Sequence, residues 1–294
     1  MAHRAGTAAI VGRPNVGKST LVNALVGQKV AIVTPRPQTT RTRIVGIRTL
    51  PEAQLVLIDT PGLHQARSLL NRRMVDLART SLAEADVAVL VVDAASGIKG
   101  GDREIVEGLA ATKAPTVVVL NKIDLIVKSK ILPVMAALAD LLPGAELVPA
   151  SAKTGAELAT VLDVIVSKLP EGPRLYPEEE FTTETERSLV LELVREQIFL
   201  ATRDEVPYGA AVLLDEFTEK PEKALTVIKA TILVDRESHK PIVLGSGGER
   251  IKAIGTTARQ EIEALLGTKV FLELFVRVEP GWSESPRRLT ELGL

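Results

Sequence analysis

The sequence predicts an α/β protein, in which a mostly parallel sheet with helices on both faces is followed by a smaller α+β domain. Short continuous apolar runs alternate with helical patterns through the first half, which is typical of parallel sheets. A glycine-rich motif stands directly between the first of these strands and the first helix. After about residue 180 the order becomes helix, strand, strand, helix and strand. A chain of 294 residues is long enough for two such domains.

The strands of the first half are expected to be buried, because their apolar runs are continuous rather than alternating. A further strand over residues 43–50 is expected to pair antiparallel with the next strand, across the short connection "PEA". The buried runs cover residues 8–12, 54–60, 87–93, 116–122 and 146–151.

Amphipathic periodicity predicts helices between these strands. Their expected ranges are residues 19–26, 69–84, 102–112, 131–142 and 156–169. Open sheets of this type bind ligands beyond the carboxyl ends of their strands. The functional residues of the first half are therefore expected at those ends.

The stretch "GRPNVGKST" follows the first strand and matches the phosphate-loop pattern G-x-x-x-x-G-K-[ST]. Its glycines let backbone N–H groups surround phosphates at a helix N-terminus. Lys18 is expected to reach the β- and γ-phosphates, and the Ser19 hydroxyl to bind Mg²⁺. A chance glycine turn is the alternative, which the strand–loop–helix context disfavours. The nucleotide contacts expected in this phosphate loop are Gly12, Arg13, Pro14, Asn15, Val16, Gly17, Lys18, Ser19 and Thr20.

The stretch "LNKID" ends the strand over residues 116–120 and selects the base. A carboxylate at Asp124 can accept both the ring N–H and the exocyclic amino group of guanine. Adenine offers neither donor, and the unpaired charge would disfavour it strongly. A polar turn is the alternative for this motif by itself, but after an intact phosphate loop the pattern favours GTP. The expected base contacts are Asn121, Lys122 and Asp124, supported by backbone N–H groups of Ser151, Ala152 and Lys153.

The stretch "DTPG" ends another strand and is expected to respond to the γ-phosphate. Asp59 would hold the magnesium shell through water, and the Gly62 N–H would sense the γ-phosphate, with Thr60 and Pro61 between them. In "RPQTTRTR", Thr40 is the expected metal ligand and Thr39 its alternative; a mobile basic loop is the other interpretation. Loss of the γ-phosphate would release both segments, as in an order–disorder switch.

The sequence lacks the usual group that positions the attacking water. Leu63 occupies the place of the water-orienting glutamine of Ras-like GTPases, and its side chain cannot form a hydrogen bond to water. His64 is a weak substitute, because a loop histidine is more often simply solvated. Asn15 could instead hold a monovalent cation beside the phosphates. We therefore expect slow intrinsic hydrolysis, on the order of 10⁻⁴ to 10⁻² s⁻¹, stimulated by K⁺ over Na⁺.

Composition excludes several other classes of protein. The absence of cysteine excludes disulfides and thiolate metal sites and fits a reducing compartment. The N-terminal apolar stretch is too short for a signal peptide, and no apolar run approaches 20 residues. We expect a cytoplasmic monomer.

Net charge is −1 overall, but residues 181–294 hold 15 Lys and Arg against 19 Asp and Glu. A nucleic-acid contact in that half requires a local basic patch.

A stretch with three prolines and an acidic run, residues 169–181, marks the domain boundary. The expected division is a first domain over residues 1–170, a short and fairly stiff linker over 171–180, and a second domain over 181–294. The second domain should begin with a helix from Glu186 that ends before Pro207. Strands over 210–217 and 224–235, a helix over 249–266 and a last strand over 269–278 follow.

A second glycine loop, "GSGG" at residues 245–248, opens the helix over 249–266. Such a G-x-x-G loop lets a sugar–phosphate backbone lie against a helix N-terminus. A helix–helix turn is the alternative. Trp282 is either a packing residue or an RNA contact. The residues expected at RNA are Gly245, Ser246, Gly247, Gly248, Arg250 and Lys252, with Arg236 and Lys240 nearby; a solvated helix face is the other interpretation of these charges.

The motifs "GRPNVGKST", "PQTTR", "DTPGLH", "NKID" and "SAK" resemble those of the TrmE–Era group of bacterial GTPases. The order of elements after residue 181 resembles a type II KH domain, which makes the apolar stretch "PIVLG" a helix. Together the two halves resemble the Era family over nearly the whole chain. The resemblance implies a GTPase that binds small-subunit ribosomal RNA near its 3′ end during 30S assembly. Peripheral association with the inner membrane is also known in this family, although no segment here indicates it.

One departure from the family pattern affects the RNA prediction. KH loops commonly carry a basic residue between their glycines, whereas this chain has Ser246 and Gly247. Two other classes of function are alternatives. A signalling or membrane-associated GTPase whose C-terminal domain binds proteins fits the acidic second half. A metabolic or tRNA-modifying GTPase is disfavoured by the absence of cysteine.

Overall fold

The computed structural model describes residues 3–62, 68–110 and 112–294. It divides into two compact units. The second unit comprises Glu184–Leu294 together with the short segments Ile32–Thr39 and Ser68–Leu70, and the first unit contains the remaining described residues. The predictions made for Leu63 and His64 lie outside the described residues.

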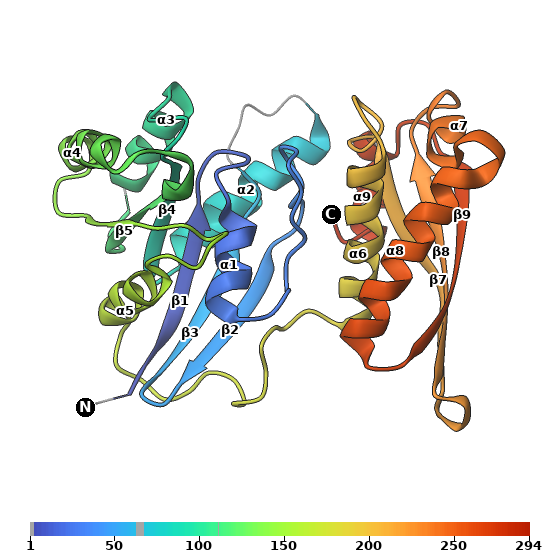
Figure 1. Ribbon diagram of the computed structural model, residues 1–294, viewed down its shortest axis with the longest axis horizontal. Coiled ribbons are helices and arrows are strands. Elements are labelled where there is room, and N and C mark those ends of the chain that lie inside the picture. Colours follow the sequence, from blue (N-terminus) through green and yellow to red (C-terminus); the bar gives the residue numbers. More distant parts are fainter. Residues whose placement is uncertain (1–2, 63–67, 111) are drawn as a thin grey trace. The chain divides into compact units, whose positions relative to one another are not determined.

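The first unit contains a six-stranded sheet in the order β2-β3-β1-β4-β5-β6 (Figure 1). All neighbouring strands pair in parallel except β2, which pairs antiparallel with β3 along its whole length. The predicted α/β class and the antiparallel strand are confirmed. The strands are β1 (Arg4–Val11), β2 (Ile44–Leu50), β3 (Ala53–Asp59), β4 (Val87–Asp93), β5 (Thr116–Asn121) and β6 (Glu146–Pro149).

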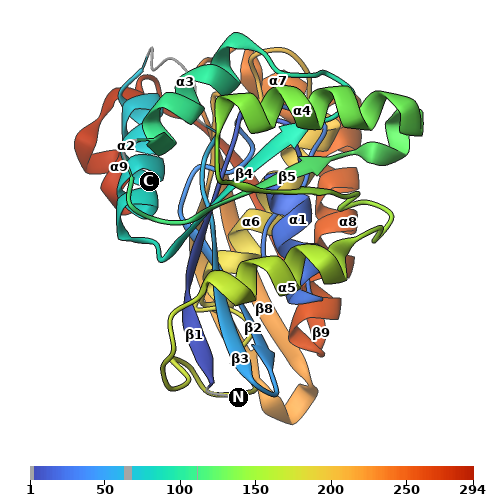
Figure 2. The ribbon, with the colours of Figure 1, turned by 90° about the vertical axis from the view of Figure 1, so that its left-hand side faces the viewer.

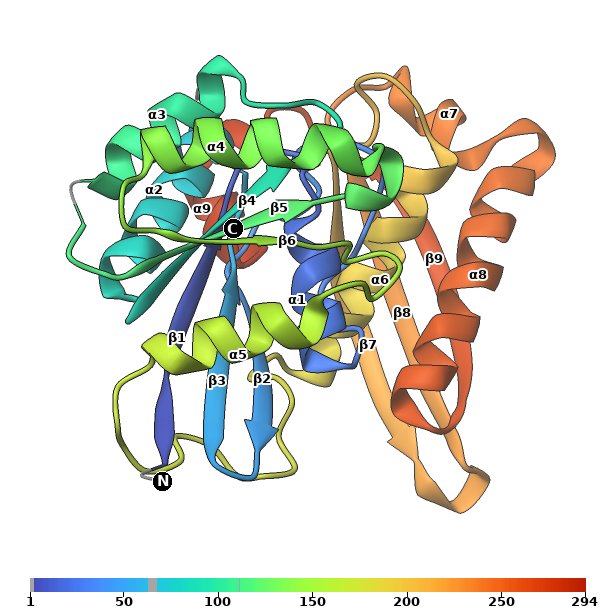
Figure 3. The ribbon, with the colours of Figure 1, turned by 60° about the vertical axis from the view of Figure 1, so that its left-hand side comes forward.

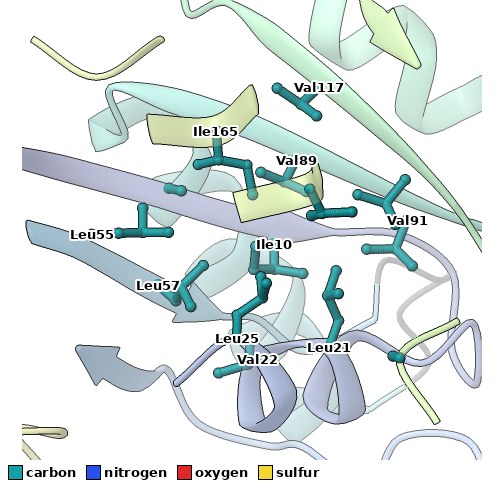
Figure 4. Close-up of a cluster of buried hydrophobic side chains, with 14 of the residues drawn as sticks. Ile10, Leu21, Val22, Leu25, Leu55, Leu57, Val89, Val91, Val117 and Ile165 are labelled. Carbon is teal, nitrogen blue, oxygen red and sulfur yellow. The ribbon is translucent and has the colours of Figure 1, made fainter. Parts of the chain in front are cut away.

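Helices cover both faces of this sheet, as Figures 2 and 3 show. One face packs against α1 and α5, and the buried side chains between them include Leu21, Leu57 and Ile165 (Figure 4). The other face packs against side chains such as Leu82, Ile105 and Leu138. The helices are α1 (Lys18–Val26), α2 (Leu69–Glu84), α3 (Gly100–Ala110), α4 (Ile131–Leu141) and α5 (Leu158–Lys168).

Two helix starts differ from the sequence prediction for local reasons. Helix α3 begins at Gly100 rather than at Asp102, because the Asp102 carboxylate accepts the Lys99 backbone N–H at 2.8 Å and turns the chain earlier. Helix α5 begins at Leu158 rather than at residue 156. Gly155 and Glu157 both have left-handed backbone angles (φ 84° and 59°), which no α-helix can include.

The predicted linker packs against the sheet of the first unit. The Ile47 N–H donates to the Phe181 carbonyl at 2.8 Å, and the Thr182 hydroxyl donates to Val45 O at 2.6 Å. Gln54, fully buried on β3, accepts the backbone N–H groups of Leu175 and Tyr176. The contacts of Phe181 and Thr182 cover part of the outer edge of β2, which would otherwise offer unpaired backbone groups.

The second unit contains a three-stranded sheet in the order β7-β8-β9. Strand β7 pairs antiparallel with β8, and β8 pairs in parallel with β9. Helices α6 and α8 pack on one face of the sheet (Figures 1 and 3). The type II order and the helical "PIVLG" stretch are confirmed. The elements are α6 (Glu186–Ala201), β7 (Ala210–Lys220), β8 (Leu225–Val234), α7 (His239–Leu244), α8 (Glu249–Leu266) and β9 (Lys269–Val278).

The C-terminal residues add elements that the sequence patterns did not predict, including α9 (Pro286–Glu291). Trp282 is 1% exposed, and its indole N–H donates to Gly209 O at 3.0 Å. It is a packing residue, so the alternative of an RNA contact was wrong. In the described parts of the chain, no helix has the length and apolar character needed to span a bilayer.

Candidate functional site

The phosphate loop joins β1 to α1 and is folded tightly against its neighbours. Gly12 (φ 152°) and Gly17 (φ 98°) have backbone angles that favour glycine. A Cβ at Gly12 would lie 2.5 Å from the Val91 carbonyl oxygen, and one at Gly17 would lie 2.3 Å from Asn121 Nδ2. Both glycines of the sequence motif are therefore required by close packing as well as by backbone conformation.

Lys18 lies inside this loop. Its side chain is 7% exposed, and Nζ donates to the carbonyl oxygens of Gly12 and Arg13, each at 3.1 Å. Burial lowers the pKa of Lys18 to about 8, although the charge of Asp59 opposes the shift. The ammonium group is thus held where the loop would receive phosphates, and it lacks a carboxylate partner at salt-bridge distance in the described residues.

Three oxygen-bearing side chains meet beside Lys18. Ser19 Oγ donates to Asp59 Oδ2 at 2.6 Å and lies 3.0 Å from Thr40 Oγ1, and the Thr40 hydroxyl donates to the same carboxylate oxygen at 3.3 Å. Burial raises the pKa of Asp59, against the opposing charge of Lys18 and these hydrogen bonds. Its other oxygen, Oδ1, is buried without a hydrogen-bond partner in the described chain. Such an oxygen set fits Mg²⁺, a hard cation that prefers oxygen ligands.

The structure distinguishes Thr40 from its neighbour Thr39. The Thr39 hydroxyl lies 2.6 Å from Thr34 Oγ1 and donates to the Arg36 carbonyl at 3.0 Å, so it closes a local turn. Of these two threonines, Thr40 is the one that contacts the Ser19 and Asp59 side chains. Thr40 is therefore the better candidate for the metal ligand.

The segment after β3 crosses close to the phosphate loop. The Thr60 hydroxyl donates to Ile10 O on β1 at 2.7 Å, which fixes the direction of the chain. A Cβ at Gly62 would lie 2.8 Å from the Pro14 nitrogen. Glycine at position 62 thus lets this backbone approach the Pro14 backbone of the phosphate loop closely.

In the candidate base motif, Asn121 and Asp124 have different environments. Asn121 is buried and braces two loops, since Nδ2 donates to Val16 O at 2.8 Å and Oδ1 accepts the Ala152 N–H at 2.9 Å. The exposed Asp124 carboxylate is oriented by the Ser151 hydroxyl, which donates to Oδ1 at 2.6 Å. The Ala152 N–H, one of the expected base contacts, is the group that donates to Asn121 Oδ1. Lys153 is exposed.

Lys122 connects the base motif to the phosphate loop. Its Nζ donates to Asn15 O at 2.6 Å and to Asp93 Oδ2 at 2.8 Å. Burial by itself would raise the pKa of Asp93, but the hydrogen bond and charge of Lys122 hold it below its usual value. Both Asn15 and Lys122 have left-handed backbone angles. Sequence reasoning missed Asp93, although its position at the carboxyl end of a strand was a usable signal.

The second glycine loop, residues 245–248, has a more open environment. Gly245, Gly247 and Gly248 have positive φ values of 74°, 56° and 83°. A Cβ at Gly247 or Gly248 would have no atom within 4 Å, and the N-terminus of α8 has no side-chain cap. Ser246 and Lys252 are exposed.

Arg250, one of the expected RNA contacts, is already engaged. Its Nη1 donates to the Ile242 carbonyl at the end of α7, so only part of its guanidinium can meet a ligand. No sequence pattern indicated this helix-capping contact.

Comparison with known families agrees with this architecture. Residues 7–122 match the family model described as 50S ribosome-binding GTPase, and residues 205–283 match the KH domain model. The fold and the phosphate and base motifs therefore define a P-loop GTPase joined to a KH domain.

The relatives identify the family within that class. The chain is 48% identical over 290 residues to GTPase Era of Geobacter metallireducens, covering 99% of this chain and 97% of that protein. It is 46% identical over 294 residues to GTPase Era of Mycobacterium avium, covering 99% and 98%. The chain belongs to the GTPase Era family, and it is a GTPase.

Solved structures give the same result. The chain matches a single-residue variant of Aquifex aeolicus Era bound to GDP·AlF₄⁻ with a TM-score of 0.96 and 42% identity, covering 99% of both chains. The match to Era in complex with MgGDPNP and nucleotides 1506–1542 of 16S ribosomal RNA has the same TM-score, identity and coverage.

Proposed function

We propose that this protein is a GTP-dependent switch that binds small-subunit ribosomal RNA near its 3′ end and acts in 30S subunit assembly. The observation that carries the proposal is the match, at TM-score 0.96 over 99% of both chains, to an Era structure that holds MgGDPNP and 16S nucleotides 1506–1542. The open glycine loop before α8 supports it, because RNA backbones approach such loops closely.

For the nucleotide, we assign roles to residues at the carboxyl ends of the four strands β1, β3, β5 and β6. Lys18 neutralises the β- and γ-phosphates, the Gly62 N–H binds the γ-phosphate, and Asp124 accepts the guanine donors. The remaining contacts come from Gly12, Arg13, Pro14, Asn15, Val16, Gly17, Ser19, Thr20, Asp59, Thr60, Pro61, Asn121, Lys122, Ser151, Ala152 and Lys153. The reaction is hydrolysis of GTP to GDP and phosphate.

For cofactors, we propose that Ser19 and Thr40 bind Mg²⁺ and that Asp59 holds it through water. Held there, the ion would supply positive charge that neutralises the charge developing on the phosphates during hydrolysis. Asn15 is proposed to hold K⁺. Its backbone is fixed by Lys122, which leaves the exposed side chain at the loop surface. Slow intrinsic hydrolysis follows from Leu63, which cannot orient water.

For RNA, we propose that the backbone N–H groups of Gly245, Ser246, Gly247 and Gly248 contact phosphates, assisted by Arg250 and Lys252. The functional division we propose is a G domain over residues 1–170, a linker over 171–180 and a KH domain over 181–294. We further propose a cytoplasmic monomer. Peripheral contact with the inner membrane rests on family resemblance alone.

A gel-shift titration with an RNA equivalent to 16S nucleotides 1506–1542 tests the proposal. It is run with a non-hydrolysable GTP analogue and with GDP, against an RNA of scrambled sequence. We expect preferential binding to the 3′-end RNA that depends on the nucleotide. Equal, weak binding of both RNAs would favour the alternative, a GTPase whose acidic C-terminal half binds protein partners.

A further inference from the structure

Asp102 is a buried carboxylate that none of the roles above uses. It lies in the first turn of α3 and is 0% exposed. Its Oδ2 accepts the Lys99 backbone N–H at 2.8 Å and Arg13 Nε at 2.7 Å, whereas Oδ1 is buried without a hydrogen-bond partner in the described chain. A buried charge is unfavourable unless an opposite charge balances it, and Arg13 is the cation that forms a salt bridge with it here.

Arg13 belongs to the phosphate loop, and its side chain turns away from that loop onto the connection between β4 and α3. Its Nη2 donates to Ser96 Oγ at 3.1 Å. A Cβ at Gly101 would lie 2.9 Å from Arg13 Cδ, so the start of α3 closes over the arginine stem. Meanwhile the Arg13 carbonyl accepts Lys18 Nζ at 3.1 Å. The residue therefore links α3 to the lysine of the phosphate loop.

The same turn is held at its other end by the base motif. Lys122 Nζ binds Asn15 O at 2.6 Å and Asp93 Oδ2 at 2.8 Å, and Asp93 Oδ1 accepts the Ser96 N–H at 3.2 Å. Because Ser96 also accepts from Arg13, these contacts close a ring around the turn over residues 13–15. Asn15 has φ 64°, a conformation that persists in a non-glycine residue only where its surroundings hold it.

We propose that Asp102 is a positioning residue for the nucleotide. Acting through Arg13, it holds the turn over residues 13–15 in its phosphate-binding shape before the nucleotide arrives. Because the loop is already ordered, less conformational entropy is lost when the nucleotide binds. The inference rests on the proposed role of the phosphate loop. Since GDP and GTP share the α- and β-phosphates that the backbone N–H groups of such a loop surround, Asp102 affects both ligands alike.

The test begins with Asp102→Asn in the full-length chain, an exchange that keeps shape but removes the charge that balances Arg13. We expect GDP and a non-hydrolysable GTP analogue to bind roughly tenfold more weakly, as expected for loss of one charge-assisted contact. The kcat at saturating GTP stays within about twofold, because bound phosphates restore the loop. A structural role alone would not produce this separation of KM from kcat.

A double-mutant cycle shows whether Asp102 acts through Arg13. Arg13→Ala by itself should also weaken nucleotide binding about tenfold. The double variant Arg13→Ala/Asp102→Asn should bind no more weakly than the weaker single variant, because the same contact is removed twice. Losses that multiply to about 100-fold would mean independent effects and would overturn the proposal.

Asp86→Asn is the matched control. Asp86 Oδ2 accepts the Thr7 N–H at 2.7 Å and the Thr7 hydroxyl at 3.0 Å, just before the amino end of β4, away from the phosphate loop. It should lower the melting temperature without changing nucleotide affinity. If Asp102→Asn behaves like this control, with affinity within about twofold of wild type, the inference fails. If wild type itself does not bind guanine nucleotides, the proposed function fails first.

Discussion

The molecule contains two glycine-rich loops that each lead into a helix, and they differ in how much of their surroundings the protein itself supplies. In the phosphate loop, a side chain added at Gly12 or Gly17 would meet backbone or buried amide atoms within 2.5 Å. In the second glycine loop, a Cβ at Gly247 or Gly248 would meet nothing within 4 Å. The first loop is enclosed at both of its motif glycines, whereas the second is open at Gly247 and Gly248 and closed only at Gly245, where a Cβ would lie 2.8 Å from the Arg250 nitrogen.

This difference suits two kinds of ligand. An enclosed loop with a buried lysine can surround a small polyphosphate on several sides, where low effective dielectric strengthens each contact. An open loop admits an extended polymer that touches it along one side. A change in the enclosed loop should therefore have a larger effect than the same change in the open loop.

The exchange of glycine for alanine at matched positions tests this directly and has the largest expected effect. Gly17 and Gly248 have similar backbone angles, φ 98° and 83°, and each precedes a helix. Gly17→Ala strains the left-handed backbone and also displaces the Asn121 amide. Together the two effects cost about 3 kcal/mol of free energy. We expect GDP affinity to fall about 100-fold, measured by fluorescent-nucleotide titration.

Gly248→Ala is the paired control, since it introduces only the strain of about 1 kcal/mol. RNA affinity in a gel shift should fall less than about fivefold. If the two variants lost affinity for their ligands equally, the enclosed and open loops would not differ in the way the packing indicates.

Gly248→Asp should have the next largest effect, because it places a negative charge at the N-terminus of α8. A like charge facing a phosphate costs several kcal/mol, which corresponds to a loss of RNA affinity of at least ~30-fold. GTP hydrolysis should stay nearly unchanged. RNA affinity equal to wild type in this variant would show that the RNA does not approach residues 245–248.

The two loops also differ in how far the sequence could predict them. The phosphate loop was predicted from its own residues, because a strand, a glycine pattern and a lysine stand in one local stretch. The second glycine loop needed the resemblance to a known family, since four residues with three glycines also fit a simple turn. Contacts such as Arg13 to Asp102 had no sequence signal, because their partners lie 89 positions apart and follow no period.

Other features were fixed by packing that no local pattern shows. The sequence predicts a short, fairly stiff linker in the proline-rich stretch that ends at Phe181, but nothing in it indicates that its backbone finds hydrogen-bond partners on β2 and β3. Trp282 offered two interpretations until its burial and its bond to Gly209 were known. The packing of the linker and the burial of Trp282 both depend on contacts between residues far apart in the sequence.

The enclosure of the phosphate loop should also make GDP affinity depend on pH, with a change of about tenfold per pH unit above the pKa of Lys18. Burial lowers the pKa of Lys18 to about 8 from 10.5. Above pH 8 the nucleotide-free protein loses this proton, whereas phosphates favour the charged ammonium, so binding must take a proton up. GDP affinity should be nearly constant below about pH 8 and fall about tenfold per unit above it.

Calorimetry in two buffers of different ionisation enthalpy measures this uptake. Close to one proton per GDP is expected at about pH 9, and close to none at about pH 7. An uptake near zero at both values would mean that the lysine stays charged in the free protein, and the loop would then be less enclosed than its packing indicates.

The smallest expected effect comes from adding a charge to the open loop. Gly247 has no neighbour that a side chain would meet, so Gly247→Lys costs only about 1 kcal/mol of left-handed strain. The lysine supplies the basic residue that this loop lacks. If a phosphate passes beside it, RNA affinity at low salt should rise a few-fold, and the slope of log K against log salt should become steeper by about 0.7.

Gly144→Lys, also at an open left-handed position but in the first unit, provides the control for charge alone. A salt slope that changes equally in both variants would mean that the gain is a general attraction to RNA, and that the open loop is not where the backbone lies.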